Sequence, residues 1–449
     1  MKTANSVDQV INPSTIPQGS RIYAAGNSAT PNILLNRLAE NEAISGVELL
    51  GALLMGDLEN LFSEKTCERI THRIIFNGPQ SRTALNSGRA MYQLMHLSDI
   101  PRQLQKYIQP DVVLLTVSGP DNGGNYSLGT AVEGIPAAIS SAKSRGGLVI
   151  AERNARMPFV LGSTIKEDMI DYLLDTDYDL PVHPAIGADE KAEKIGRIIA
   201  EHYIHDGCTL QYGIGEVPEA VTQAVLDKGV RELGIHTELF ATAMRKLVQS
   251  GAVTNRYNQR PFSISSLFLA ENREGYEWLD YNSSIQSRPC NVTNSTMNIA
   301  KRPNMVAVNS AIGVDLHGNI WADSLNATKI FSGIGGQSDF LRGANLSPGG
   351  VPIIAMKSAT ASGVPKILEK SPEGITSTAI AADPVVIVTE QGAFDPRGLS
   401  ICEHAVGIAH LAEPHTREEL LRHIYETDKF HKPRQALSDK LPKGFIPCD

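Results

Sequence analysis

Short runs of consecutive apolar residues alternate along the chain with longer segments whose apolar positions recur every three or four residues. The runs at residues 112–117, 148–152, 351–356 and 384–390 are rich in Val, Ile and Leu, which is typical of strands covered by helices on both faces. Residues 191–203 show the helical spacing of apolar positions instead. The pattern therefore predicts an α/β protein with mostly parallel sheets.

The two halves of the chain carry similar segments about 190 residues apart. One segment begins at Gly19 and the other at Gly207, and each passes from a short apolar strand through a turn of small residues to a proline. These prolines, Pro31 and Pro218, stand where the first turn of a helix tolerates proline best. Further residues match at a constant separation of 194: Asp121, Gly124 and Asn125 correspond to Asp315, Gly318 and Asn319. The sequence therefore predicts two tandem, structurally similar α/β domains.

We place these domains at residues 1–185 and 186–449. The segment 166–190, with its prolines and acidic residues, is predicted to be the linker between them. Two similar α/β domains in tandem form a cleft of the kind in which such proteins tend to bind ligands. We therefore expect functional residues where the two halves meet.

Composition and charge exclude several classes of protein. The chain has 41 Lys and Arg against 49 Asp and Glu, a net charge of −8, and lacks the long basic runs that bind nucleic acid. Its 5 cysteines form no CxxC pair, which argues against a disulfide framework and against a zinc site. The N-terminus lacks the apolar core of a signal peptide, and the longest apolar stretch, 47–55, is too short to cross a bilayer. We predict a cytoplasmic protein with no metal and no nucleic-acid or membrane partner.

A glycine loop lies between a predicted strand and a predicted helix of the second half. It consists of Gly213, Ile214, Gly215, Glu216 and Val217. Glycines let the backbone approach a ligand closely, and the N-terminus of a helix offers free N–H groups to an anion such as phosphate. The same pattern also occurs in turns that serve packing alone, so both interpretations stay open at this point.

Apolar residues surround Glu238 in the sequence LGIHTELF, at the end of a predicted strand. At the end of a strand its carboxylate would be partly desolvated, which is costly unless the group has a task. Alternatively, Glu238 begins the following helix, where the helix dipole favours an acidic residue. The pattern of residues does not choose between the two.

A second glycine loop, at residues 331–340, contains Gly333, Gly335 and Gly336 just ahead of a predicted helix. Such a loop can direct backbone N–H groups at a developing oxyanion or at phosphates. The first half has no equivalent of this loop, which favours a site over simple packing. Residues 388–393 close a buried strand and then turn.

Four motifs together resemble a known enzyme family. LQYGIGEVPEAV, LGIHTELF, FSGIGGQSDFLRGA and VIVTEQGAFDPRG, in this order and spacing, are similar to the acetyl-CoA hydrolase/transferase family of glutamate-dependent CoA-transferases. NGPQSRTALNSGRAMYQL and VSGPDNGGNYSLG resemble the N-terminal domain of the same family, so the resemblance spans nearly the whole chain. Within the family, the sequence is most similar to the branch that acts on 4-hydroxybutyrate, butyrate and itaconate. The resemblance implies the CoA-transferase fold.

The resemblance also implies roles for individual residues. Glu238 matches the catalytic glutamate, and Asn294 matches an asparagine that polarises the acyl carbonyl. Gly336 would join Asn294 in stabilising the oxyanion. The residues that would bind CoA lie on the two glycine loops: Gly213, Ile214, Gly215, Glu216, Val217, Gly335 and Gly336.

The sequence departs from the family pattern at three places. Glu216 puts a negative charge in a loop that more often reads GIGGIP, next to an anionic cofactor. Gln391 stands where the family has a tyrosine, and residues 402–404 replace its arginines. These departures bear on the choice of substrate, which the sequence does not determine. Candidates for contact with the tail of the acid are Arg82, Arg89, Met91, Tyr92 and Gln391.

The function predicted from these residues is transfer of CoA from a short-chain acyl-CoA, such as acetyl-, butyryl- or succinyl-CoA, to a small carboxylic acid. Glu238 would carry the CoA as a glutamyl-CoA thioester in a ping-pong mechanism. CoA would be substrate and covalent intermediate, no cofactor would stay bound, and the protein would be a homo-oligomer, a dimer or tetramer. The alternatives are an acyl-CoA hydrolase using the same glutamate and a non-catalytic acyl-CoA-binding protein. A nicotinamide-dependent dehydrogenase is disfavoured, because no GxGxxG follows a strand.

Overall fold

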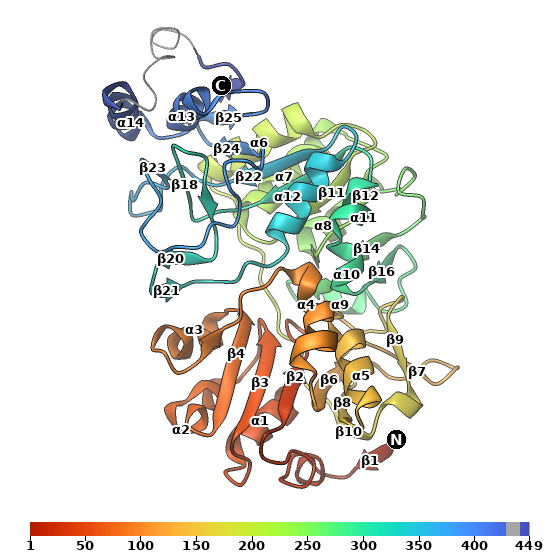
Figure 1. The fold of residues 1–449 in the computed structure, drawn as a ribbon. Coiled ribbons are helices and arrows are strands. Elements are labelled where there is room, and N and C mark those ends of the chain that lie inside the picture. The colour runs from red at the N-terminus through yellow and green to blue at the C-terminus, as the bar shows by residue number, and fades with distance from the viewer. Residues whose placement is uncertain (428–440, 449) are drawn as a thin grey trace.

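The computed structural model describes residues 1–427 and 441–448 of the chain; the predicted domain 186–449 also includes residues outside these ranges. Figure 1 shows two α/β halves, one above the other, with the N-terminus in the lower half and the C-terminus in the upper. Each half is built on one large sheet. The predicted α/β class with mostly parallel sheets is confirmed.

The first sheet has 8 strands, and all its neighbouring strands are parallel. In spatial order they are β1 (Lys2–Ala4), β10 (Tyr172–Thr176), β8 (Leu148–Asn154), β6 (Val112–Val117), β2 (Arg21–Ala24), β3 (Val47–Ala52), β4 (Ile70–Phe76) and β5 (Met91–Tyr92).

The second sheet has 7 strands, and its last two pairings are antiparallel. In spatial order they are β12 (Gly234–Ile235), β11 (Thr209–Tyr212), β17 (Met305–Asn309), β22 (Val351–Ala355), β24 (Val386–Thr389), β25 (Gly392–Phe394) and β26 (Phe445–Pro447).

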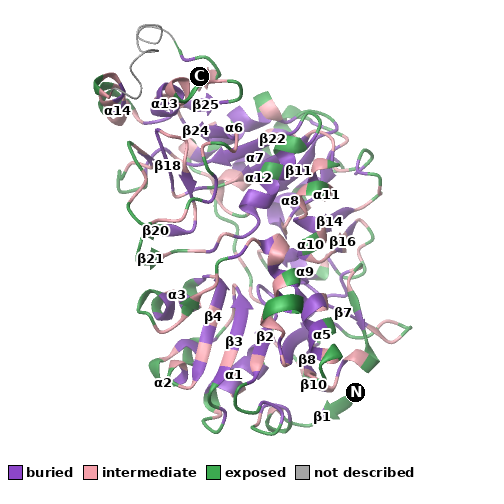
Figure 2. Cartoon of the chain, in the orientation of Figure 1, coloured by how far each residue is buried: buried purple, intermediate pink, exposed green. Residues whose placement is uncertain are grey.

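Helices cover both faces of each sheet, as the apolar strand runs predict. The main helices are α1 (Asn32–Glu40), α3 (Pro79–Asn86), α4 (Ile100–Gln103), α5 (Ile135–Ser144), α6 (Glu190–Tyr203), α7 (Glu216–Lys228), α8 (Thr242–Gln249), α10 (Cys290–Thr293), α11 (Thr296–Ala300), α12 (Gln337–Leu346), α13 (Ile401–His410) and α14 (Pro414–Glu426). In the first half, α1 packs on one face and α5 on the other; in the second, α6 and α7 face α11 and α12 across the sheet. Figure 2 shows that the strands of both sheets are largely buried.

The internal repeat is confirmed by the order of the strands. The series β3-β2-β6-β8-β10 in the first sheet corresponds to β12-β11-β17-β22-β24 in the second. The matched turns also have the same geometry: Asp121 Oδ1 accepts the backbone N–H of Asn125, and Asp315 Oδ1 accepts that of Asn319, both at 2.9 Å. One architectural unit therefore occurs twice in the chain.

The predicted linker at 166–190 is wrong in its first part. Residues 172–176 form β10, which lies between β1 and β8 in the first sheet. The acidic residues that interrupt its apolar pattern are paired: Asp175 Oδ1 lies 2.6 Å from Arg153 Nε, and Asp171 Oδ1 lies 2.8 Å from Lys143 Nζ. The long irregular stretch is residues 177–189, and the proposed boundary between residues 185 and 186 falls within it.

The two halves share part of their hydrophobic core. Ala29, Ala131 and Met157 of the first half belong to the same buried cluster as the core of the second sheet. Helices α4 and α10 lie at this junction (Figure 1). No helix in the described part of the chain is both long and apolar enough to span a bilayer.

Candidate active site at the junction of the two halves

Glu238 lies between two short strands, three residues after β12 and directly before β13 (Leu239–Ala241). Its backbone carbonyl accepts hydrogen bonds from Ser266 N at 3.1 Å, Leu267 N at 2.9 Å and Ser265 Oγ at 2.8 Å. Helix α8 begins only at Thr242, so the alternative that Glu238 starts this helix is wrong. The side chain of Glu238 is partly buried, and the hydrogen bonds to its backbone carbonyl fix the position from which it projects.

Asn294 is the closest polar partner of the Glu238 carboxylate. It follows α10, is fully buried, and its Nδ2 donates to Glu238 Oε2 at 2.7 Å. The Thr293 hydroxyl donates to Asn294 Oδ1 at 2.7 Å, which fixes the amide with its nitrogen toward Glu238. The Thr293 carbonyl lies 2.7 Å from Nε2 of His236, whose Nδ1 lies 3.1 Å from an Arg260 nitrogen. Because the guanidinium can only donate, His236 is neutral with its proton on Nε2.

The glycine loop at 333–336 approaches Glu238 more closely than any side chain would allow. A Cβ placed on Gly336 would lie 1.9 Å from Glu238 Oε2 and 2.0 Å from Asn294 Nδ2. Gly335 has a φ of +59°, in the left-handed region that favours glycine. A Cβ on Gly333 would lie 2.8 Å from the backbone of Phe76 in the first half. The sequence-predicted residues Glu238, Asn294 and the loop glycines thus come together at one point.

Residues of the first half hold this loop in place. Leu97 N donates to the Gly335 carbonyl at 2.9 Å, and Arg82 NH2 donates to the Phe331 carbonyl at 3.0 Å while its guanidinium stacks on the Phe331 ring at 4.3 Å. The Tyr92 hydroxyl donates to Asp323 Oδ2 at 3.2 Å. Two of the residues considered for the tail of the acid therefore serve the junction between the halves.

The other three candidates for the acid tail lie elsewhere. Arg89 NH1 pairs with Glu64 Oε1 at 3.0 Å, and Met91 is 54% exposed on the edge strand β5. Gln391 Oε1 accepts from Arg417 NH2 of α14 at 3.2 Å. Nothing in these contacts brings the three residues to Glu238.

Three carboxyl groups gather at the junction and influence one another. The pKa of Glu238 is raised to about 7, mainly by burial and to a smaller extent by the charge of Asp339, while hydrogen bonds from Asn294 and the Gly336 backbone oppose the shift. Burial also raises the pKa of Asp339, whose Oδ1 accepts from Ser98 Oγ at 2.7 Å. The cluster can therefore hold a proton near neutral pH.

Glu133 is the third carboxyl group of this cluster and comes from the first half. It is 1% exposed, and the Tyr23 hydroxyl donates to its Oε2 at 3.3 Å. Burial, and then the charge of Glu238, raise its pKa to about 8. The raised pKa favours the protonated form of Glu133 near neutral pH.

Replacing Asp339 by asparagine is expected to move the acid limb of the activity profile to lower pH. A nucleophilic Glu238 must be ionised, so its raised pKa makes activity fall as the pH drops below about 7. Removing the negative charge of Asp339 lowers that pKa, and the shift should be about half a pH unit or more. The measurement is kcat/KM against pH. The control is Asp383→Asn, because Asp383 pairs with Arg342, which lies on the same helix as Asp339. An unshifted acid limb would contradict the assignment.

The loop at 213–217 has the geometry of a strand-to-helix turn that only glycine permits. Gly215 has a φ of +113° and precedes α7. Within the described part of the chain, no side chain caps the N-terminus of α7. The equivalent helix of the first half differs, because the buried Glu152 carboxylate accepts the Leu34 N–H of α1 at 2.8 Å. The N-terminus of α7, in the second half, therefore has free N–H groups, and it follows the loop that the sequence predicts to bind CoA.

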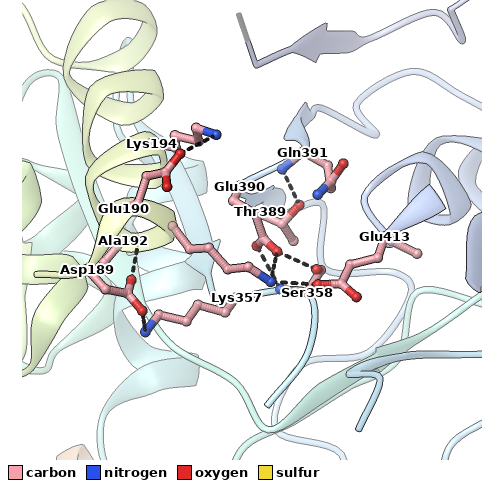
Figure 3. Close-up of polar contacts among 12 residues, drawn as sticks. Asp189, Glu190, Ala192, Lys194, Lys357, Ser358, Thr389, Glu390, Gln391 and Glu413 are labelled. Atoms are coloured by element: carbon pink, nitrogen blue, oxygen red, sulfur yellow. Dashed lines mark hydrogen bonds and ion pairs between the residues drawn. The ribbon is translucent and has the colours of Figure 1, made fainter. Parts of the chain in front are cut away.

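Glu216 is neutralised by a lysine from another strand. Lys357, two residues after β22, forms an ion pair with the Glu216 carboxylate and lies 2.7 Å from Asp189 Oδ2. Figure 3 shows Lys357 beside Asp189, and shows Ser358 and Glu413 near the buried Glu390. The charge that departs from the family pattern thus has a built-in counter-ion.

Two residues of the departing segment 402–404, Glu403 and His404, make contacts within the fold. Ser400 caps α13, because its Oγ accepts the Glu403 N–H, while Glu403 Oε2 accepts the Ser400 N–H at 2.7 Å. His404 Nε2 lies 3.0 Å from the Pro396 carbonyl. Within residues 1–427 and 441–448, no three His, Cys, Asp or Glu side chains are arranged to hold a metal ion.

Comparison with known proteins assigns the chain to a family. The acetyl-CoA hydrolase/transferase N-terminal domain matches residues 6–183 and the C-terminal domain of the same description matches residues 272–424. The 4-hydroxybutyrate coenzyme A transferase of Clostridium kluyveri is 35% identical over 416 residues, 91% of this chain and 94% of that protein. The succinyl-CoA:acetate/propanoyl-CoA:succinate CoA transferase of Fasciola hepatica is 32% identical over 424 residues, 92% of this chain and 86% of that protein.

A solved structure shows the same fold. The crystal structure of RipA from Yersinia pestis superimposes with a TM-score of 0.86 at 29% identity, covering 95% of this chain and 97% of that one. The fold, the site and these relatives define an enzyme of the CoA-transferase class. The chain belongs to the acetyl-CoA hydrolase/transferase family.

Proposed function

We propose that this enzyme transfers CoA from a short-chain acyl-CoA to a small carboxylic acid through a glutamyl-CoA thioester on Glu238. The observation that supports this most directly is the arrangement of a partly buried carboxylate between the Asn294 amide and the Gly336 backbone N–H. A carboxylate is a weak nucleophile in water, and withdrawal from water together with fixed donors makes its reaction with a thioester feasible.

The proposed reaction begins when Glu238 Oε attacks the acyl carbonyl carbon of the donor. The C–S bond breaks, CoA leaves as a thiolate, and Glu238 becomes part of a mixed anhydride. The thiolate then attacks the Glu238 side-chain carbonyl carbon, which forms the glutamyl-CoA thioester and releases the first acid as a carboxylate. The acceptor carboxylate reverses these steps, so bonds and charges balance without a further reactant.

Asn294 and Gly336 would supply hydrogen bonds to the oxygen that becomes negative in each addition step. Donors held in a site with little water stabilise such charge without having to reorient. Binding of the remote nucleotide part of CoA at Gly213, Ile214, Gly215, Glu216 and Val217 would help to position the thioester, with Gly335 and Gly336 next to it.

The substrates proposed are acetyl-, butyryl- or succinyl-CoA as donor and 4-hydroxybutyrate, butyrate or itaconate as acceptor. The activities named for the relatives support 4-hydroxybutyrate as acceptor and succinyl-CoA as donor within this range. CoA would be both substrate and covalent intermediate, and no other cofactor would be needed. We further propose a cytoplasmic homo-oligomer, dimer or tetramer, with domains at 1–185 and 186–449.

The test is to trap the intermediate and to follow both possible fates of it. After incubation with acetyl-CoA, peptide mass spectrometry should find CoA attached to Glu238, and borohydride should convert this group to an alcohol. A parallel assay measures CoA transfer to 4-hydroxybutyrate against release of free thiol. Release alone would indicate a hydrolase, and absence of any adduct during turnover would refute the mechanism.

A further inference from the structure

Lys357 holds two carboxylates together at the edge of the second sheet where ligands of open α/β sheets bind. One is Glu216, the first residue of α7; the other is Asp189, which also caps α6 by accepting the Ala192 N–H at 2.9 Å. The side chains of Lys357 and Glu216 are 25% and 34% exposed. The pair is therefore reachable from solvent.

The helix dipole favours an acidic residue at the first position of α7, but Glu216 has few other contacts there. Glu216 does not cap α7, and Lys357 is the one ion-pair partner it has among the described residues. Asp189 orients Lys357 independently of Glu216. Glu216 stands instead directly after Gly215, at the helix terminus whose free N–H groups suit an anion.

A second lysine, Lys366, lies near this pair. It is partly buried, and its backbone N–H donates to the carbonyl of Ser358, the residue after Lys357, at 2.9 Å. Burial, and then the positive charge of Lys357, lower the pKa of Lys366, while the negative charge of Glu390 opposes the shift. Lys357 is thus the lysine that contacts the loop at 213–217, through Glu216.

We infer that Glu216 competes internally with the phosphate groups of CoA: it occupies Lys357 in the free enzyme and yields this lysine when CoA or an acyl-CoA binds. The inference rests on the proposed function for the identity of the ligand. A phosphate group carries more negative charge than a carboxylate and can displace it from a lysine.

The competition weakens binding of CoA and so eases its release. The ligand must first break the Glu216–Lys357 pair. The free energy needed to separate the pair makes the binding free energy of the ligand less favourable. Since the cost is the same for the donor acyl-CoA and the product acyl-CoA, it acts on affinity rather than on the chemical step.

Replacing Glu216 by glutamine should therefore tighten binding. By titration calorimetry, the Kd of CoA for the full-length E216Q enzyme should fall about three- to tenfold, and the KM for acetyl-CoA should fall as well. The matched control is Glu219→Gln, which removes an acidic residue from the same turn of α7 but one that pairs with Lys246 at 2.7 Å. The control makes the same change in net charge and in the interaction with the helix dipole. It should leave the Kd of CoA within about twofold of the wild-type value.

A double-mutant cycle tests whether the gain passes through Lys357. Lys357→Met alone should weaken CoA binding, and adding Glu216→Gln to it should produce no gain. An unchanged or higher Kd in E216Q, or a gain that persists without Lys357, would overturn the inference. Its failure is distinct from failure of the proposed function: tighter CoA binding in E216Q without any CoA transfer by the wild type would support the inference and refute the function.

Discussion

Glu238→Gln is expected to reduce the kcat of CoA transfer by about 10⁴-fold, because loss of a covalent nucleophile has effects of this order. Glutamine keeps the size of the side chain, and its oxygen can still accept the hydrogen bond that Asn294 donates to Glu238 at 2.7 Å. The loss is therefore chemical and not structural. The measurements are steady-state transfer from acetyl-CoA and mass spectrometry of the adduct, which should be absent.

A buried carboxylate outside the site provides the control for this variant. Glu152 is fully buried, accepts the Leu34 N–H, and also accepts the Tyr178 hydroxyl at 2.6 Å. Glu152→Gln should form the adduct as the wild type does, even if the protein becomes less stable. Transfer by Glu238→Gln within about tenfold of the wild type would show that another group is the nucleophile.

The sequence predicts most of the fold because its strands are continuous apolar runs. Strands β6, β8, β22 and β24 lie where such runs occur, and a buried parallel strand has no polar face to interrupt them. Strand β10 was missed because Asp175 breaks its pattern. The arginine that pairs with Asp175 lies on the neighbouring strand, which a reading along the chain does not reveal.

The site was predicted to the extent that it lies in short continuous motifs. Glu238, Gly335 and Gly336 belong to such motifs, and the structure brings them into contact with Asn294. Their roles in the reaction stay predictions, which the experiments above test.

The residues that sequence reasoning missed act from a distance along the chain. Asp339 lies inside the motif FSGIGGQSDFLRGA, but its influence on Glu238 depends on how helix α12 is placed. Glu133 comes from the other half, and Lys357 is 141 residues from Glu216. No local pattern marks such pairs, because only the folded sheets bring them together.

The first half matters for chemistry that resides in the second. It supplies Leu97, whose N–H holds the Gly335 carbonyl, and Ser98, whose hydroxyl holds Asp339. The backbone of Phe76 leaves room only for a glycine at position 333. The donors near Glu238 are thus fixed by contacts between the halves, and a small change in the loop should have a large effect on the rate.

Gly336→Ala is the sharpest test of this arrangement and is expected to lower kcat by about 10²- to 10³-fold, because the added methyl group displaces the backbone N–H from Glu238 and misplacing an oxyanion donor has effects of this order. The added methyl group would lie 1.9 Å from Glu238 Oε2 and 2.0 Å from Asn294 Nδ2. Asn294 is held by Thr293 and cannot retreat, so either the nucleophile or the loop must move. The readout is the rate of adduct formation with acetyl-CoA, measured in a single turnover.

Gly119→Ala is the control for this variant, since a Cβ there meets no atom of the described chain within 4 Å and φ is not positive. It should form the adduct at the rate of the wild type, with an unchanged melting temperature. If Gly336→Ala kept more than about a tenth of the wild-type rate, the close approach of the loop would not serve the reaction, because a methyl group at van der Waals overlap with both Glu238 and Asn294 must displace one of them.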